Sequence, residues 1–271
     1  FYPLQFPQDD WQEVYAQIGM DFEVMLDHGR ERLLEFLQSR IGFFDCIIVS
    51  RDHNMDFFNQ AVLLDPRIAQ HTRIIYDAEA LIAPRKIMHR RLLGETVSEA
   101  EAISAIKQEA HKARLADAVI AVSEYEADYF RSYENKPTVV AGHAIRPRRT
   151  ENVFASRKDL LFVGALREDD SPNVDSLVWF MEQCWPAIRT AEPETRLVVV
   201  GDNTAPALNG INDKRIVFKG RQASIESFYD TCRVFIAPTR FAAGIPHKVH
   251  EAAANGLSLI HISEPTRQHW I

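Results

Sequence analysis

The stretch that most constrains the fold of this chain is 233–256, which reads RVFIAPTRFAAGIPHKVHEAAANG. The apolar run 234–237 is typical of a buried parallel strand. A glycine-containing loop follows over 238–246, and 247–255 has the composition of a helix that Gly256 would end. This order brings backbone N–H groups and the positive end of a helix dipole to one point, which predicts a phosphate-binding site.

Two charged residues of this helix would complete such a site. Lys248 lies one turn into the helix, and Glu251, three residues later, lies on the same face. With a nucleotide sugar, Lys248 would bind the diphosphate and Glu251 would accept hydrogen bonds from the ribose hydroxyls. The same residues would also make an ordinary surface pair, because any α/β protein contains strand–loop–helix units. The rest of the chain has to decide between these interpretations.

Charge and cysteine usage narrow the class of protein. The net charge is −7 over 271 residues, so bulk electrostatics disfavour nucleic acid and anionic membranes as partners. The length predicts two domains. No apolar run is long enough to cross a bilayer, and no signal-peptide pattern opens the chain. Cys46, Cys184 and Cys232 lie in apolar surroundings without CxxC spacing, which predicts buried free thiols in a reducing compartment, the cytoplasm.

The first half alternates apolar runs with helical patterns, which predicts a parallel sheet with helices on both faces. Strands are expected at 1–4, 22–26, 44–50, 73–77, 117–123 and 138–141. Helices are expected at 10–18, 30–40, 55–64, 80–115 with an interruption near Gly94, and 123–133.

Ligands of such sheets bind beyond the carboxyl ends of the strands, which singles out Asp77, Glu79 and Ser123. Asp77 would equally cap a turn, and Ser123 is explained most simply as a helix N-cap. His247 and His250 are three residues apart, which is not the i,i+4 spacing of an HExxH zinc site, and we expect no metal.

A second α/β pattern begins after a polar, basic segment, 145–158, which is the best candidate for a linker. Strands are expected at 159–163, 196–200 and 215–218, a helix from Asn173, and a short helix at 225–229. Gly164 and Gly201 directly follow two of these strands. Glycine there would let a ligand approach the backbone or would simply make a tight turn. The GxGxxG dinucleotide fingerprint is absent.

Taken in order, DLLFVGALREDDSPNVDSLVWF, RLVVVGD, RIVFKG and the 233–256 stretch resemble the carboxyl-terminal domain of family 4 glycosyltransferases (glycosyl transferases group 1). The resemblance implies a GT-B fold, in which two Rossmann-like α/β domains face each other across a cleft. An acceptor-side domain would occupy 1–145, a linker 146–158 and a donor-binding domain 159–257. YDAEAL and DAVIAVSEYEADYF fall where the family has its acceptor-side strand and a helix near the cleft.

Site residues follow from the resemblance position by position. Gly164 and the loop with Arg167 would lie near the donor diphosphate, and Gly244 and Ile245 would surround the donor sugar and phosphates. Gly201 is a candidate donor-binding residue because it directly follows a strand. Lys248 lies in the helix that follows this loop. Glu251 matches the second acid of the family's E-x7-E motif. The first acid falls on Ala243, so the motif is broken here, as in a Gly-Ile-containing subset of the family. The family's acceptor-domain histidine is not found near Asp77, although Glu79 stands close to that position.

The implied reaction is transfer of a sugar from a nucleotide-diphosphate donor to a hydroxyl acceptor, with retention of anomeric configuration. Lys248, Arg167 and the helix start would stabilise the leaving diphosphate without a metal or other cofactor. Asp77 or Glu79 would face the acceptor, which could be a glycan, a lipid or another hydroxyl compound. Peripheral contact with a membrane stays open. A nucleotide-sugar epimerase and a non-catalytic nucleotide-sugar binding module are the alternatives.

Both ends depart from the family. Its first strand and Gly-rich loop would lie upstream of Phe1, so both domains are expected to be incomplete, and such a fragment can be inactive even if its parent is an enzyme. After Gly256 the family continues with a PVV-type strand, whereas this chain reads LSLIHISEPTRQHWI. That run resembles a translated sequencing adapter, which predicts that 258–271 is foreign to the fold. A genuine divergent strand at 259–262 is the alternative.

Overall fold

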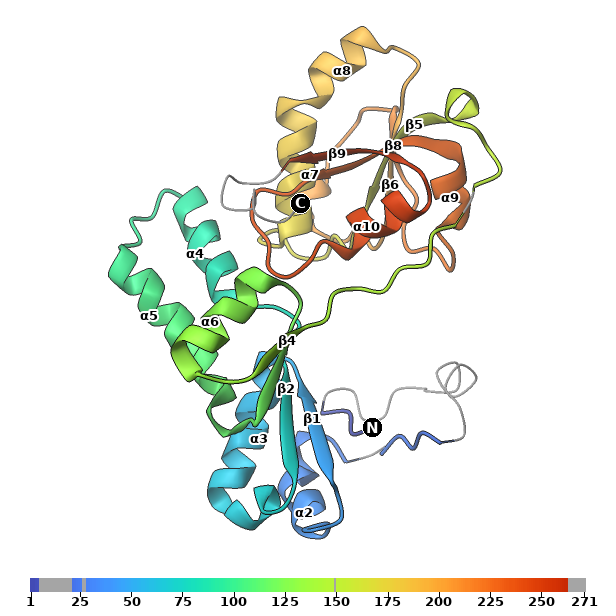
Figure 1. The fold of residues 1–271 in the computed structure, drawn as a ribbon. Helices are drawn as coiled ribbons and strands as arrows, with labels where there is room; N and C mark the ends of the chain where they lie inside the picture. Colours follow the sequence, from blue (N-terminus) through green and yellow to red (C-terminus); the bar gives the residue numbers. More distant parts are fainter. Residues whose placement is uncertain (5–20, 26–27, 149, 263–271) are drawn as a thin grey trace. The chain divides into compact units, whose positions relative to one another are not determined.

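The computed structural model describes residues 1–4, 21–25, 28–148 and 150–262. The chain divides into two compact units, Phe1–Gly142 and His143–Ile271. Each contains one parallel β-sheet, of four strands in the first unit and five in the second (Figure 1). The predicted class, α/β with two parallel sheets, is therefore confirmed.

The first unit has its strands in chain order. The strands are β1 Cys46–Ser50, β2 Arg73–Asp77, β3 Ala118–Ala121 and β4 Thr138–Val140. The helical segments are η1 Arg30–Arg32, α2 Leu33–Gln38, α3 Asp52–Leu64, η2 Pro66–Ala69, α4 Ile82–Leu92, α5 Glu99–Ala110, η3 His111–Leu115 and α6 Glu124–Glu134. Tyr76 of β2 and Phe130 of α6 are both fully buried and pack edge to face, joining the sheet to this helix.

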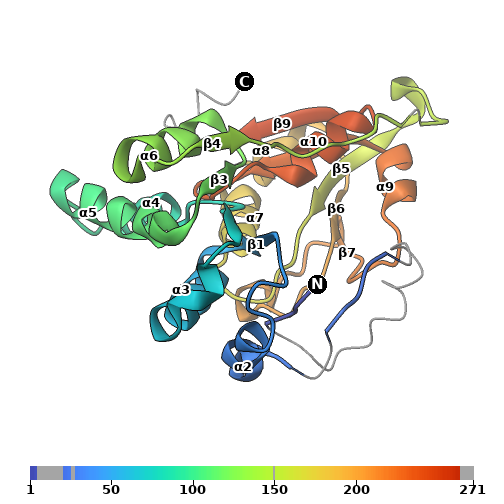
Figure 2. The ribbon, with the colours of Figure 1, turned by 60° about the horizontal axis from the view of Figure 1, so that its bottom comes forward.

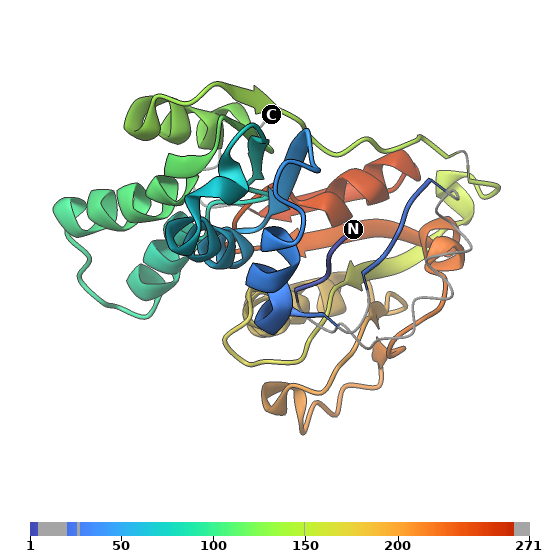
Figure 3. The same cartoon turned by 90° about the horizontal axis from the view of Figure 1, so that it is seen from below.

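The long helical pattern at 80–115 is broken where the sequence predicts it. Gly94 has a positive φ of 84°, a conformation that glycine adopts without strain, and follows the end of α4. Ser98 then caps α5 by accepting a hydrogen bond from the Glu101 N–H. The two helices form a hairpin (Figures 1 and 3).

The prediction of strands at 1–4 and 22–26 is wrong for the residues that the structure describes. Residues 1–4 and 22–25 carry no strand. Instead, the Tyr2 ring packs 4.5 Å from the Phe36 ring, and its hydroxyl donates to the Gly29 carbonyl. Tyr2 therefore contacts α2 from a loop. The helix expected at 10–18 and the strand position Leu26 lie outside the described residues.

The second unit has the strand order β7-β6-β5-β8-β9, which is the 3-2-1-4-5 order of a Rossmann-like half. Its strands are β5 Lys158–Val163, β6 Leu197–Val200, β7 Ile216–Phe218, β8 Cys232–Pro238 and β9 Ser258–Ile262. Its helical segments are η4 Phe154–Ser156, α7 Pro172–Gln183, α8 Trp185–Ala191, η5 Pro206–Leu208, α9 Glu226–Thr231 and α10 His247–Ala254.

Side chains of β5 alternate between two cores, as the two-residue period of a strand requires. Leu160 and Phe162 pack with α7 and α8, whereas Leu161 packs with α9 and α10. Figures 1 and 2 show these helix pairs on opposite sides of the sheet. Central strand β5 is thus buried on both faces, which explains its continuous apolar sequence.

Much of the predicted linker docks on the second unit. Buried Arg157 donates to the Gly256 carbonyl at 3.0 Å, and the Asn152 amide donates to Asp230 at 2.7 Å. At the other end of the chain, β9 pairs in parallel with β8. Residues 259–262 therefore form a strand in this structure, as the alternative interpretation predicted. The foreign origin of 258–271 stays a prediction.

The cysteines are free, but their burial differs from the prediction. Cys232 is buried and Cys184 is partly buried, whereas Cys46 is exposed. Cys46 begins β1, the first strand in the sheet order of its unit, so only one side of that strand is paired among the described residues. No helix in the described part of the chain combines the length and apolar character needed to cross a membrane.

Candidate functional site

The winding direction of the second unit reverses at the carboxyl ends of β5 and β8, and we call this place the β5–β8 crevice. The chain leaves β5 for α7 on one face of the sheet and leaves β8 for α10 on the other. In open parallel sheets, ligands bind at this reversal of winding direction. Gly164 follows β5, and Arg240, Gly244 and Ile245 lie in the loop that follows β8.

Lys248 reaches across this edge of the sheet. It projects from the first turn of α10, yet its Nζ donates to the Asn173 side chain in the first turn of α7, at 2.7 Å. The same Nζ lies 4.7 Å from the centre of the Phe162 ring, a cation–π contact. Lys248 is half-buried. The structure therefore puts this predicted site residue at the crevice between β5 and β8.

Gly164 follows β5 and Gly201 follows the neighbouring strand β6. At both positions, neighbouring protein atoms leave no room for a side chain. A Cβ on Gly201, which has φ 134°, would lie 2.0 Å from the Gly164 carbonyl oxygen. A Cβ on Gly164 would lie 2.9 Å from Cγ of Asn173. The close approach that the sequence suggested for a ligand is thus made, at both positions, by neighbouring protein groups.

Two arginines at the crevice are held by carboxylates. Arg167 binds Asp202 through Nε and Nη2, at 3.0 and 2.5 Å, and its side chain stays 62% exposed. Arg240 binds Asp175 of α7 with both ends of its guanidinium group. The pair formed by Arg240 ties the loop after β8 to the start of α7.

Glu251 lies on α10, three residues after Lys248. Its carboxylate is 3.8 Å from Nδ1 of His247, and its side chain is 34% exposed. Burial and the neighbouring Glu251 carboxylate raise the pKa of Tyr229. Gly244 has φ 68°, and the Ile245 carbonyl accepts from the His247 N–H at 2.9 Å. The roles of Gly244, Ile245 and Glu251 in donor binding stay predictions.

A pH prediction arises from the histidines around α10. Partial burial, followed by the nearby His247 and His250, holds the pKa of His143 below its ordinary value. The rings of His143 and His247 are 4.7 Å apart. The unfolded chain then binds more protons than the folded one just below pH 6.5, so stability is lost as pH falls from there toward the lower folded pKa.

We expect His143→Asn to weaken the loss of stability between pH 7.5 and 5.5, measured as the shift of the urea unfolding midpoint. His71→Asn, in the other unit, is the control, and asparagine suits the positive φ of 65° at that position. An unchanged acid dependence in His143→Asn would contradict the assignment.

In the first unit, Asp77 and Glu79 lie at the carboxyl end of β2. Asp77 accepts from the Ser50 hydroxyl at 2.9 Å and from the Glu79 N–H at 3.4 Å, so it does serve a turn. Glu79 pairs with Arg51 at 3.0 Å, and both residues have a positive φ, of 52° and 75°. Such strained backbone is common at functional sites. Ser123 caps α6 by accepting from the Glu126 N–H, as the simpler interpretation predicts.

Buried carboxylates fix the loop that carries Glu79. Glu109, 7% exposed, accepts from the N–H groups of Ile82 and Ala83, at 2.7 and 2.5 Å. Glu126, 3% exposed, accepts from the Leu81 N–H at 3.2 Å. Burial raises the pKa of Glu109. The chain direction after Glu79 is therefore set by hydrogen bonds to two distant helices.

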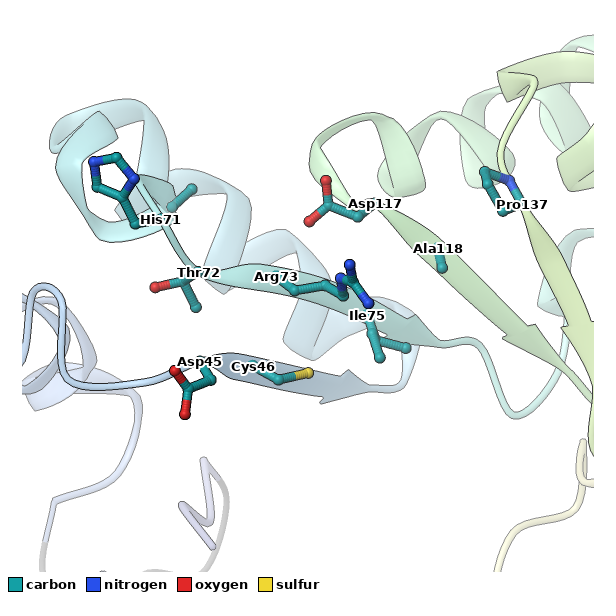
Figure 4. Close-up of a pocket in the computed structure, with 10 residues that line it drawn as sticks. Asp45, Cys46, His71, Thr72, Arg73, Ile75, Asp117, Ala118 and Pro137 are labelled. Carbon is teal, nitrogen blue, oxygen red and sulfur yellow. The ribbon is translucent and has the colours of Figure 1, made fainter.

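A pocket of about 1020 Å³ lies at the opposite, amino-terminal edge of this sheet (Figure 4). Its lining includes Asp45, His71, Arg73 and Asp117, which begin or precede adjacent strands. Acidic and basic groups are balanced there, and parallel sheets bind ligands at the other edge. Among the described residues, no group of three or more His, Cys, Asp or Glu side chains is arranged to hold a metal ion.

Residues 157–267 match the family described as glycosyl transferases group 1. This segment contains the crevice residues from Gly164 to Glu251. This part of the chain is therefore similar to a group 1 glycosyltransferase domain. No curated protein matches the chain in sequence. The matched segment lies in the second unit, which contains β5, β8 and α10.

Solved glycosyltransferase structures share the fold. HepE from Anabaena, in complex with UDP and glucose, has a TM-score of 0.61 at 14% identity, covering 88% of this chain and 66% of HepE. A TarM variant from S. aureus, in complex with Fondaparinux, alpha-GlcNAc-glycerol and UDP, has a TM-score of 0.61 at 10% identity, covering 85% and 44%.

The pneumococcal O-GlcNAc transferase GtfA, in complex with UDP and GlcNAc, has a TM-score of 0.58 at 16% identity, covering 89% and 46%. The chain thus spans just under two thirds of HepE and less than half of TarM and GtfA. These likenesses confirm the predicted GT-B fold class.

Sequence reasoning missed Asn173, Asp175 and Arg240 as parts of the β5–β8 crevice, and Arg51 in the first unit. Arg51 directly follows β1, so the same carboxyl-end rule that selected Asp77 would have found it. Asn173 was noted only as the start of a helix, because a contact with a residue 75 positions away leaves no local pattern.

Proposed function

We propose that this protein transfers a sugar from a nucleotide-diphosphate donor to a hydroxyl acceptor, with retention of anomeric configuration. The observation that carries the proposal is the position of Lys248, which lies at the β5–β8 crevice, in the segment that is similar to a group 1 glycosyltransferase domain. HepE, TarM and GtfA, which share the fold, are described in complexes with UDP.

The main catalytic task in this proposal is to stabilise negative charge on the leaving nucleoside diphosphate. Lys248, Arg167 and the positive end of α10 supply that potential, and the proposal invokes no metal ion. Gly164, Gly201, Gly244 and Ile245 shape the donor loops. Glu251 accepts hydrogen bonds from the ribose.

Asp77 and Glu79 serve the acceptor, which is a glycan, a lipid or another hydroxyl compound, and nucleic acid is not a partner. The location we propose is the cytoplasm, because the three cysteines are free thiols.

A nucleotide panel tests the proposal. UDP, GDP, ADP and their sugars are added to the full-length protein, and thermal unfolding is followed. A ligand that binds only the folded state at 100 times its Kd adds roughly 2.7 kcal/mol of stability, so we expect one nucleotide series to raise the Tm by several degrees.

The same samples separate the alternatives. Release of the nucleoside diphosphate identifies a transferase, interconversion of the donor sugar without an acceptor identifies an epimerase, and stabilisation without turnover identifies a binding module. No shift with any nucleotide would overturn the proposal.

A further inference from the structure

We infer that Asn173 is a positioning residue of the donor site, holding the Lys248 ammonium group over the carboxyl end of β5. This inference rests on the proposed function, because it assigns Asn173 a role through Lys248. It concerns α7, the helix on the opposite face of the sheet from the one that carries Lys248.

Both ends of the Asn173 side-chain amide are engaged. Its Oδ1 accepts from Nζ of Lys248 at 2.7 Å, and its Nδ2 donates to the Ala165 carbonyl at 3.1 Å. A carboxamide supplies one acceptor and two donor hydrogens, so it satisfies these opposite partners at once. Aspartate at this position could accept from Lys248 but could not donate to the Ala165 carbonyl.

The backbone around Asn173 is built to hold this amide in place. Ser171 caps α7 by accepting from the Val174 N–H at 3.3 Å, and Pro172 begins the helix. Gly164 leaves room for the amide, because a Cβ there would lie 2.9 to 3.1 Å from three of its atoms. The glycine that ends β5 is therefore explained by the Asn173 side chain that packs on it.

Ordering of Lys248 before the ligand arrives has a direct consequence for affinity. A free lysine side chain loses rotamer entropy when it is fixed. Asn173 and the Phe162 ring already fix Lys248 in the folded protein without ligand. Lys248 therefore loses less entropy when a diphosphate binds. Asn173 should therefore strengthen binding of the diphosphate and leave binding of the nucleoside unchanged.

The test compares Asn173→Ala, Asn173→Asp and Gly164→Ala in the full-length protein by titration calorimetry. The probes are whichever of UDP, GDP and ADP the wild type binds most tightly, and the matching nucleoside. We expect diphosphate binding to weaken about 3- to 10-fold in Asn173→Ala, the size of one lost hydrogen bond. Asn173→Asp should weaken it at least tenfold, because its carboxylate neutralises Lys248 and repels the diphosphate.

Gly164→Ala should also weaken diphosphate binding, because its Cβ displaces the Asn173 amide. This variant provides a second test if an Asn173 variant fails to fold. Nucleoside binding should stay within twofold in every variant. In a Lys248→Ala background, Asn173→Ala should change diphosphate binding by less than twofold, since its effect passes through Lys248. Asn212→Ala, an exposed asparagine of the same unit, is the matched control.

The outcomes separate this inference from the proposed function. Equal weakening of nucleoside and diphosphate, or additive losses with Lys248→Ala, would show a merely structural role and overturn the inference alone. Diphosphate binding that no Asn173 variant changes would do the same. A wild-type protein that binds none of the three nucleotides would overturn the proposed function and this inference together.

Discussion

Lys248→Ala should lower turnover by about one to three orders of magnitude, the loss observed when a group that stabilises transition-state charge is removed. The ammonium group is half-buried and held at the β5–β8 crevice by Asn173 and Phe162. Its loss leaves the diphosphate charge to Arg167 and Arg240, which are already paired with Asp202 and Asp175.

The measurement is the release of nucleoside diphosphate from the donor that the nucleotide panel identifies. Hydrolysis by water needs no acceptor, so the assay can be run before the acceptor is known. The turnover of Lys248→Arg should lie between that of Lys248→Ala and that of the wild type, because arginine keeps the charge but not the compact geometry of an ammonium group. Lys214→Ala, an exposed lysine of the same unit, is the control. Turnover within twofold of wild type in Lys248→Ala would remove Lys248 from the mechanism.

Gly201→Ala should destabilise the second unit by roughly 3–5 kcal/mol, a large part of the 5–15 kcal/mol that a whole domain has. The added Cβ would meet the Gly164 carbonyl oxygen at 2.0 Å and its carbon at 2.7 Å, and both are backbone atoms of an adjacent strand end. The φ of 134° at Gly201 adds strain for any residue with a side chain.

Urea unfolding followed by tryptophan fluorescence measures the loss. Trp185 is 3% exposed and donates its indole N–H to Asp213, so it reports on the core of this unit. Gly210→Ala is the matched control. Gly210 also has a positive φ, of 86°, but a Cβ there meets nothing within 4 Å, so its substitution should cost only about 1 kcal/mol. Equal losses in the two variants would show that the clash contributes nothing.

The buried strands could be predicted from the sequence because their signal is local. RIIYD coincides with β2, and the other apolar runs from residue 44 onward agree with β1 and β3 to β8 within two residues at either end. Ser98 and Ser123 are N-caps whose acidic neighbours mark the helix start. The strand predicted for FYPL was wrong, because an apolar residue that packs on α2 from a loop gives the same sequence pattern as one in a strand.

The site could be predicted only in part, for the same reason. Lys248 was selected because it lies in the first turn of a helix after a buried strand, which is a local pattern, and its role stays a prediction. Its partner Asn173, and the pair of Arg240 with Asp175, join segments more than 60 positions apart, and sequence spacing carries no information on such contacts. The glycines were located correctly, but the atoms that require them belong to the protein itself.

The division of β5 between two cores limits where this domain can be altered. Leu160, Leu161 and Phe162 each fill space in one core or the other, so exchanging any of them disturbs packing on which the donor loops depend. Residues 167–170, by contrast, are exposed beside the same strand end. We expect substitutions of residues 168–170 to leave the fold intact and substitutions on the strand to cause misfolding.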